Sequence, residues 1–301
     1  MLSPIVRAAA EQYPDVAFTV LSQQRMEDLF ADMPPNVTFH GVNLRKDSLK
    51  QIVSGLGTYD LVADMHSVLR SVYIRSAMRL RRARVASINK GRWSKQLLTR
   101  GYRRKPLMHT TERYAAVFAR LGLPITLPQA VHSDGTGIGI APFAAHPGKI
   151  YPIERMERVV AMLSEHRIPI ILFGGGKKEQ DILSAWAERY PSVQSVAGKH
   201  TMREELELMR GLRLMVTMDS GNMHMASLVG TRVLSIWGAT HPYAGFLGYG
   251  QCEQDCISRD LDCRPCSVYG NKKCQFGDYR CLDIAPEEVA QTIIKAYDRR
   301  D

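Results

Sequence analysis

The sequence predicts an α/β protein with two Rossmann-like domains, each built on a doubly wound parallel sheet. Short apolar runs alternate with helical patterns along most of the 301 residues, which is typical of parallel strands joined by crossover helices. A chain of this length exceeds what one hydrophobic core usually serves. A Pro- and Gly-containing stretch without periodicity, residues 123–136, predicts the linker, so we place the domains at 1–130 and 131–301.

The elements of the first domain follow from its apolar periodicity. Helices are expected at 2–12, 49–54, 67–80 and 110–121, and strands at 16–21, 37–42, 59–65 and 83–88. Residues 92–109 are basic and are expected to form a loop.

The second domain repeats the alternation. Strands are expected at 138–143, 169–173, 214–218 and 232–237, and helices at 153–166, 223–229 and 286–297. Polar loops follow these strands at 144–152, 174–180, 219–222 and 238–242. Loops at the carboxyl ends of parallel strands line the ligand crevice of such sheets.

The formal net charge of +10 predicts an anionic partner. No acidic residue lies between Asp64 and Glu112, a gap that holds a long run of arginines and lysines. A solvated basic face is the alternative interpretation, and a nucleic-acid-binding protein is another. Few aromatic residues interrupt the run and no nucleic-acid-reading motif is present, so nucleic acid is not expected as a partner.

The segment 219–224 reads Asp-Ser-Gly-Asn-Met-His between a buried strand and a helix. Ser220 and Gly221 open the helix, where free N–H groups and the helix dipole favour a phosphate. His224 lies in the first turn and is expected to face the same ligand. An ordinary βαβ unit with a capped helix is the alternative.

This segment, together with Gly238-Ala239-Thr240-His241-Pro242, resembles the signature of glycosyltransferase family 9, the lipopolysaccharide heptosyltransferases. The family pattern has a proline where this chain has Ala239. The resemblance extends over nearly the whole chain. It implies the GT-B architecture, an active site in the cleft between domains, and inverting transfer of a heptose from ADP-heptose to the lipopolysaccharide inner core.

The resemblance also implies roles for individual residues. Lys149, in the loop before Tyr151-Pro152, is expected to bind the donor diphosphate, and Glu179 the nucleotide ribose. Ser220, Gly221, His224 and Thr240 are expected to bind the donor, and Asp219 to hold sugar hydroxyls or cap the helix. We expect no cofactor and no divalent metal, because Lys149 and the helix dipole would balance the diphosphate.

Met1-Leu2-Ser3-Pro4 matches the point in the family where the first helix begins. We therefore expect the natural protein to have a first strand and loop upstream, and the presumed catalytic Asp of the family lies in that loop. Within this chain His66, at the end of a strand, is the candidate catalytic residue. Arg70 and Arg75 are the acceptor-side candidates.

All six cysteines lie between Cys252 and Cys281. The spacing of Cys263, Cys266, Cys274 and Cys281 is compatible with a structural zinc site, and reduced thiols are the default interpretation.

No apolar run approaches the ~18 residues of a membrane span. We expect a cytoplasmic enzyme in peripheral contact with the anionic inner membrane, with a nucleotide-sugar donor and an anionic lipopolysaccharide acceptor as its partners. A catalytically inactive relative and a non-enzymatic anion-binding protein are the alternative functions.

Overall fold

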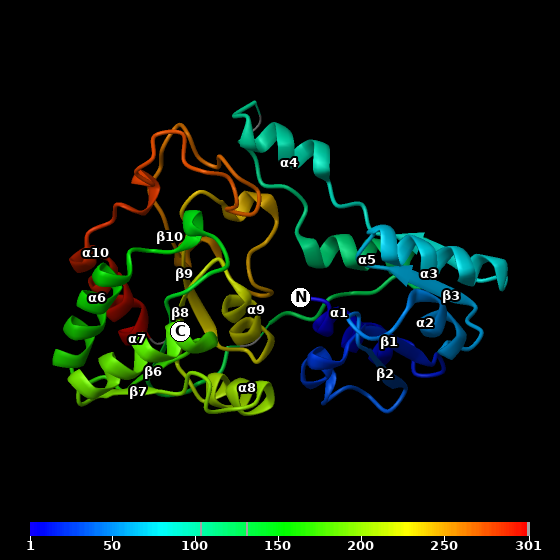
Figure 1. Cartoon of the computed structure of the whole chain (residues 1–301), viewed down its shortest axis with the longest axis horizontal. Coiled ribbons are helices and arrows are strands. Elements are labelled where there is room, and N and C mark those ends of the chain that lie inside the picture. Colours follow the sequence, from blue (N-terminus) through cyan, green and yellow to red (C-terminus); the bar gives the residue numbers. More distant parts are fainter. Residues whose placement is uncertain (103, 131, 300–301) are drawn as a thin grey trace. The chain divides into compact units, whose positions relative to one another are not determined.

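The computed structural model describes residues 1–102, 104–130 and 132–299, and the chain divides into two compact units (Figure 1). Unit 1 comprises residues 1–91 and 108–129, and unit 2 comprises 92–107 and the chain from 130 onward. Arg103 of the basic run, and residue 131, where we place the start of the second domain, lie outside the described residues. No described helix has the length and apolar character that a membrane span requires.

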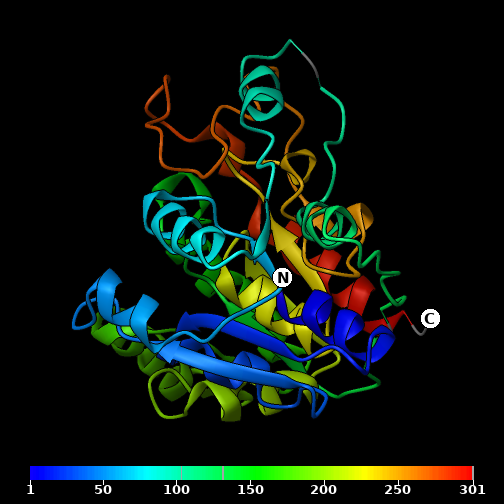
Figure 2. The ribbon, with the colours of Figure 1, turned by 90° about the vertical axis from the view of Figure 1, so that its right-hand side faces the viewer.

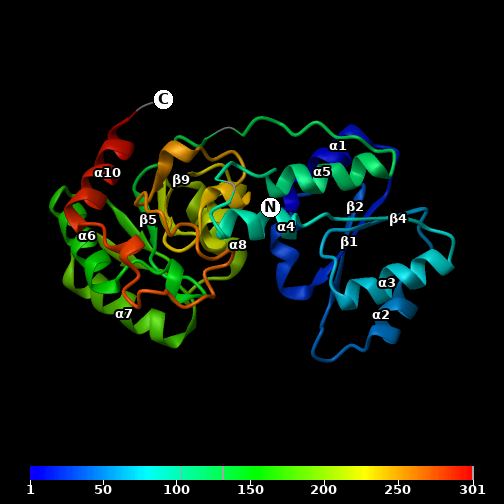
Figure 3. The ribbon, with the colours of Figure 1, turned by 90° about the horizontal axis from the view of Figure 1, so that it is seen from above.

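Unit 1 contains two separate parallel strand pairs with helices beside them (Figure 2). Its elements are α1 (Ser3–Gln12), β1 (Phe18–Gln23), a 3-10 helix (Gln24–Phe30), β2 (Val37–Val42), α2 (Leu49–Gly55), β3 (Leu61–Asp64), α3 (Leu69–Leu80), β4 (Arg84–Ser87) and α5 (Thr110–Arg120). β1 pairs with β2, and β3 pairs with β4. The packing of α2 against α3 (Figure 3) buries Ile52 and Met78 in a common cluster.

The sheet of unit 1 differs from the continuous sheet that the sequence predicts. Residues of both β1 and β3 line one cavity of about 1280 Å³. Its walls include apolar side chains such as Phe18, Val20 and Leu61, which a central strand would normally cover. The two strand pairs therefore leave these apolar side chains facing one cavity, and the strand that the family resemblance implies stays a prediction.

Unit 2 is organised on one six-stranded parallel sheet of order β10-β9-β8-β5-β6-β7. Its elements are α4 (Arg92–Thr99), β5 (Ile138–Ala141), α6 (Ile153–Glu165), β6 (Ile170–Leu172), α7 (Gly176–Arg189), β7 (Val193–Ser195), α8 (Met202–Arg210), β8 (Leu214–Met218), α9 (Gly221–Leu228), β9 (Arg232–Ile236), β10 (Cys256–Ile257) and α10 (Pro286–Asp298), with short 3-10 helices at Pro147–Lys149, Pro242–Ala244, Glu253–Asp255 and Arg280–Leu282.

Helices cover both faces of this sheet. One buried cluster joins the sheet to α6 and α10, through residues such as Met156, Val289 and Ile293. A second buried cluster joins it to α8 and α9. Every residue of β5 and β8 is buried, which explains why these strands read as unbroken apolar runs.

The strand order reverses at β5, which pairs with β6 on one side and with β8 on the other. The chain leaves β5 toward α6 and β8 toward α9, which belong to different buried clusters of the sheet. Open α/β sheets bind ligands at such a switch point. The loops that follow β5 and β8 are therefore the places where a ligand is expected.

Two loop predictions were wrong in part. Residues 92–99 form α4, because Leu98 is buried and Lys95 places its Nζ 3.8 Å from the centroid of the Phe246 ring in the same unit. α7 begins at Gly176, inside the predicted loop 174–180. Both helices are fixed by tertiary packing, which single-sequence periodicity does not report.

Candidate active site

The loops after β5 and β8 meet through an ion pair at the switch point of unit 2. Lys149 Nζ lies 2.8 Å from Asp219 Oδ2, and the two side chains are only 15% and 5% exposed. An ammonium held there is a point charge for an anionic ligand. The sequence predicted both residues as donor-binding, and the structure brings them into contact.

The loop after β9 packs tightly against the Lys149 loop. Ala239 N–H donates to Gly148 O at 2.8 Å. A Cβ on Gly238 would lie 2.4 Å from Gly148 O, and one on Gly148 would lie 3.0 Å from the Ala239 Cβ. The glycines therefore permit an approach of the two backbones that larger residues would prevent.

We expect Ala239→Pro to destabilise unit 2 by about 1–2 kcal/mol, because proline has no N–H to donate to Gly148. Urea unfolding followed by circular dichroism measures the effect. Ala239→Gly keeps the N–H and is the control. Equal stability of the Pro variant and the wild type would contradict this role of the hydrogen bond.

The buried side chain of Arg264 stabilises the loop that follows β9, residues 238–242 (the β9 loop). Only 6% of Arg264 is exposed, and its guanidinium donates to Gly238 O at 2.6 Å, to Thr240 O at 3.0 Å and to Arg259 O. Burial lowers the pKa of this guanidinium. This residue was not predicted from the sequence, although one arginine between two cysteines, next to a proline, was a visible signal.

Thr240 and His241 complete the loop. Thr240 is 1% exposed, and its Oγ1 is buried without a hydrogen-bond partner among the described residues. A buried hydroxyl left unpaired is unfavourable, so it indicates a ligand or water at this point. His241 Nδ1 accepts a hydrogen bond from Tyr243 N–H.

Burial, with a smaller contribution from Arg264, lowers the pKa of His241 to about 4. Between pH 6.5 and 4 the unfolded chain binds a proton at this residue that the folded chain does not. Stability is therefore lost as the pH falls, by about 2 kcal/mol between pH 7.5 and pH 5.0. We expect urea unfolding to show a smaller loss for His241→Asn, which keeps an acceptor but does not titrate. An identical loss in the variant would assign the pH dependence to other groups.

The N-terminus of α9 lies directly after Asp219. Ser220 is its N-cap residue, and the Ser220 Oγ lies 3.1 Å from Thr217 Oγ1. A Cβ added to Gly221 would meet no atom within 4 Å, so the space beside the first turn is open. His224 is half-buried on the same turn. Ser220 and Gly221 thus follow Asp219 directly at the start of α9, and His224 lies three residues further along the helix.

Glu179 lies on the first turn of α7, after β6. Its Oε2 accepts a hydrogen bond from Gly175 N–H at 2.7 Å and so holds the Gly-rich loop. This contact gives the carboxylate a structural role within the loop. A contact between Glu179 and a nucleotide ribose stays a prediction.

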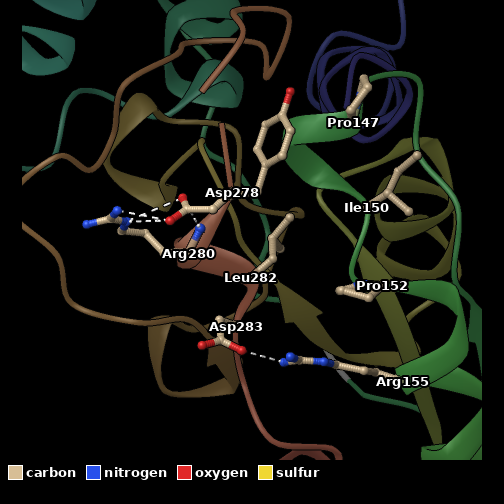
Figure 4. Close-up of a pocket in the computed structure, with 9 residues that line it drawn as sticks. Pro147, Ile150, Pro152, Arg155, Asp278, Arg280, Leu282 and Asp283 are labelled. Carbon is tan, nitrogen blue, oxygen red and sulfur yellow. Dashed lines mark hydrogen bonds and ion pairs between the residues drawn. The ribbon is translucent and has the colours of Figure 1, made fainter. Parts of the chain in front are cut away.

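A separate pocket of about 310 Å³ lies between segments 147–155 and 278–283 (Figure 4). Its charged groups pair with one another: Arg155 with Asp283 at 2.7 Å, and Arg280 with Asp278 at 2.9 Å. Pairs of this kind leave little uncompensated charge for a ligand. Lys149 is paired as well, with Asp219, so we prefer the Lys149 site because of its place at the switch point of the sheet.

The candidates of unit 1 gather around Asp64 at the end of β3. Asp64 Oδ1 accepts hydrogen bonds from the N–H groups of His66 and Ser67, and its Oδ2 forms an ion pair with Arg75 Nη1 at 3.0 Å. Arg75 thus has a structural partner. The side chains of His66 and Arg70 are exposed, and both residues line the large cavity of unit 1.

Several arginines of the basic run stabilise the fold of unit 1. Arg81 donates to carbonyl oxygens of α2 and of the residues that follow it, and Arg75 pairs with Asp64. Part of the positive charge is therefore internal to the fold, which weakens the interpretation of the run as a nucleic-acid surface.

The cysteines do not form a metal site in the described residues. All six have free thiols, and no three or more His, Cys, Asp or Glu side chains described in the structure are placed to hold a metal ion. Burial raises the pKa of Cys281 to about 11, so it carries its proton at neutral pH. The geometry gives no support to the zinc alternative.

The sequence model of the glycosyltransferase family 9 (heptosyltransferase) matches residues 50–276, which include the Lys149 site. The chain belongs to glycosyltransferase family 9. It is therefore an enzyme of the glycosyltransferase class, and its α/β architecture is of the GT-B type.

Similar proteins agree with this family. A lipooligosaccharide heptosyltransferase 2 of Campylobacter jejuni is 23% identical over 98% of this chain and 94% of its own. The solved E. coli heptosyltransferase WaaC with ADP has a TM-score of 0.69 and 17% identity, over 98% of this chain and 94% of its own. The E. coli ADP-heptose lps heptosyltransferase II has a TM-score of 0.67 and 19% identity, over 98% and 93%.

Proposed function

We propose that this family 9 enzyme transfers a heptose from ADP-heptose to the inner core of lipopolysaccharide, with inversion at the anomeric carbon. The observation that carries the proposal is the Lys149–Asp219 pair at the switch point, beside a buried Thr240 hydroxyl without a partner among the described residues. One structural relative, E. coli heptosyltransferase WaaC with ADP-2-deoxy-2-fluoro heptose, supports the choice of donor.

The donor diphosphate would lie against Lys149 and the N-terminus of α9. An ammonium has three N–H donors, so Lys149 can keep its contact with Asp219 and still donate to a phosphate oxygen. The N–H groups of the first turn of α9 and the Thr240 hydroxyl would add donors. These groups stabilise the negative charge that develops on the leaving diphosphate.

In the transfer step, an acceptor hydroxyl oxygen attacks the anomeric carbon from the side opposite the diphosphate. The bond between that carbon and the diphosphate oxygen breaks, and ADP leaves. A general base takes the hydroxyl proton. Within this chain, His66 is the candidate for the general base. The alternative candidate is a carboxylate in the loop that the family resemblance implies upstream. Lys149 and the helix dipole replace a divalent metal.

The test measures ADP release and product formation with ADP-heptose and a lipid A–Kdo acceptor. Two chains are compared: the 301-residue protein and a version extended upstream through the expected loop. Inversion is read from the anomeric coupling of the product by NMR. Activity that persists in EDTA supports the absence of a metal requirement.

The outcomes separate the parts of the proposal. Activity of the extended chain alone supports heptosyl transfer and an upstream base. Activity of the short chain that His66→Ala abolishes makes His66 the base. No transfer by either chain, or a product with retained configuration, would contradict the proposed reaction.

A further inference from the structure

The cysteine-rich segment of unit 2, residues 263–281, packs against the loops of the candidate active site. Apart from the start of the 3-10 helix Arg280–Leu282, the segment consists of turns and bends. Ser267 and Gly270 are nevertheless buried within it. Backbone groups of a buried loop need partners outside regular structure, so the contacts of these two residues show what the segment packs on.

Gly270 lies directly against the side chain of Lys149. A Cβ built on Gly270 would lie 2.6 Å from Lys149 Cγ, 3.2 Å from Cδ and 3.1 Å from Cε. The lysine chain thus runs across the bare backbone of Gly270 before its ammonium meets Asp219 at 2.8 Å. Gly270 has φ +74°, a conformation that glycine adopts without strain. A contact along three side-chain carbons restricts the rotamers of a lysine that would otherwise be flexible.

The buried hydroxyl of Ser267 fixes the turn that carries Gly270. Ser267 is 1% exposed, and its Oγ accepts a hydrogen bond from Gly270 N–H at 2.9 Å and donates to Asn271 Oδ1 at 3.3 Å. Its own N–H donates to Ala239 O of the β9 loop at 3.1 Å. Gly270 O lies 3.0 Å from the place that a Cβ on Gly148 would take. The turn therefore touches both loops that flank Lys149.

We propose that Ser267 and Gly270 are positioning residues for the donor site, because their turn holds the Lys149 ammonium where the donor diphosphate binds. The proposal rests on the proposed function, which assigns Lys149 to the diphosphate. A flexible lysine loses binding energy each time a ligand orders it, whereas a lysine ordered in advance does not. Both residues act through Lys149 and are not expected to contact the donor themselves.

The test is Gly270→Ala, whose added methyl group has to displace the lysine chain. We expect the Kd for ADP, measured by calorimetry, to rise at least about tenfold, and kcat of heptosyl transfer to fall about tenfold. Gly277→Ala is the matched control: Gly277 has φ +78° in the same segment, but a Cβ there would meet no atom within 4 Å. The control carries similar backbone strain without the contact and should bind ADP within about twofold of the wild type.

Ser267→Ala tests the turn itself, because it leaves Gly270 N–H without its acceptor. We expect the Kd for ADP to rise about threefold to tenfold. Ser267→Thr keeps the hydroxyl and should recover part of this affinity. Thermal melting should show all of these variants folded at the temperature of the binding measurement.

A second measurement reports the contact in the absence of any ligand. Lys149→Ala removes the three carbons that the methyl group of Gly270→Ala would meet. In urea unfolding, Gly270→Ala should therefore raise the unfolding equilibrium constant about tenfold more than Gly277→Ala does when Lys149 is present. With Lys149→Ala in the background, the two glycine substitutions should have equal effects.

The outcomes separate this proposal from the proposed function. Equal ADP binding by Gly270→Ala and Gly277→Ala would overturn the positioning role. An excess effect of Gly270→Ala on unfolding that persists after Lys149→Ala would also overturn it, since the methyl group would then disturb something other than the lysine. Failure of the wild type itself to bind ADP would contradict the proposed function, and the positioning role at a donor site with it.

Discussion

Replacing Lys149 by alanine is expected to lower kcat of heptosyl transfer by about 10²–10³ and to weaken ADP binding. The Lys149 ammonium is held 2.8 Å from Asp219 at the switch point, where open α/β sheets bind their ligands. Lys149→Arg should recover part of the affinity but not the rate, since a planar guanidinium does not reproduce the geometry of an ammonium. Kinetics and calorimetry with ADP measure the two effects.

Lys149→Ala also leaves the Asp219 carboxylate buried without its cation, which by itself destabilises the folded protein. The double substitution Lys149→Ala/Asp219→Asn removes both charges and separates the two effects. We expect it to restore the stability lost by Lys149→Ala but not the transfer rate. Lys177→Ala is the surface control, because Lys177 forms an exposed ion pair with Asp181 on α7. Transfer by Lys149→Ala within about threefold of the wild type would remove Lys149 from the donor site.

The core of unit 2 could be predicted because the patterns that indicate its elements lie within short stretches of the sequence. The unbroken apolar runs of β5 and β8 indicate strands buried on both faces, and the Asp219-Ser220-Gly221 break marks the start of α9. Parallel pairing then places both loops at one edge of a sheet. This pattern places Ser220 at the start of α9, whereas the role of Lys149 was predicted only through the resemblance to family 9.

The contacts within the site were less predictable because they depend on tertiary geometry. Asp219 was expected to hold sugar hydroxyls or cap the helix, since a carboxylate repels a phosphate. The structure gives the N-cap position to Ser220 and pairs Asp219 with Lys149, and a contact of Asp219 with sugar hydroxyls stays a prediction. The helix α4 escaped prediction for a related reason: its packing partner, Phe246, lies far away along the chain.

Unit 1 shows where the alternation of strands and helices is insufficient. Every strand described there was expected, yet β1–β2 and β3–β4 form separate pairs beside a large apolar cavity. Periodicity predicts that a strand exists but not which neighbour it has. The order of the strands in a sheet depends on which strand edges pair with each other in the folded chain.

The second large effect is expected at Arg264. We expect Arg264→Met to destabilise unit 2 by about 3–5 kcal/mol, because it leaves the buried carbonyl oxygens of Gly238 and Thr240, and the partly buried one of Arg259, without their donor. Chemical unfolding and the KM for the donor measure the consequences. The KM should rise, since the Thr240 hydroxyl loses its fixed position.

Arg280→Met is the matched control for Arg264. It is also an arginine beside the cysteines, but its partner Asp278 is exposed, so its loss should change stability by no more than about 0.5 kcal/mol. Arg264→Lys should rescue only part of the stability, because one ammonium cannot reproduce the fork of donors that reaches separate carbonyls. If Arg264→Met and Arg280→Met were equally stable, the β9 loop would be held by its contact with Gly148 and not by Arg264. A large loss at Arg264 alone would instead show that a buried cation positions the loop that the donor must meet.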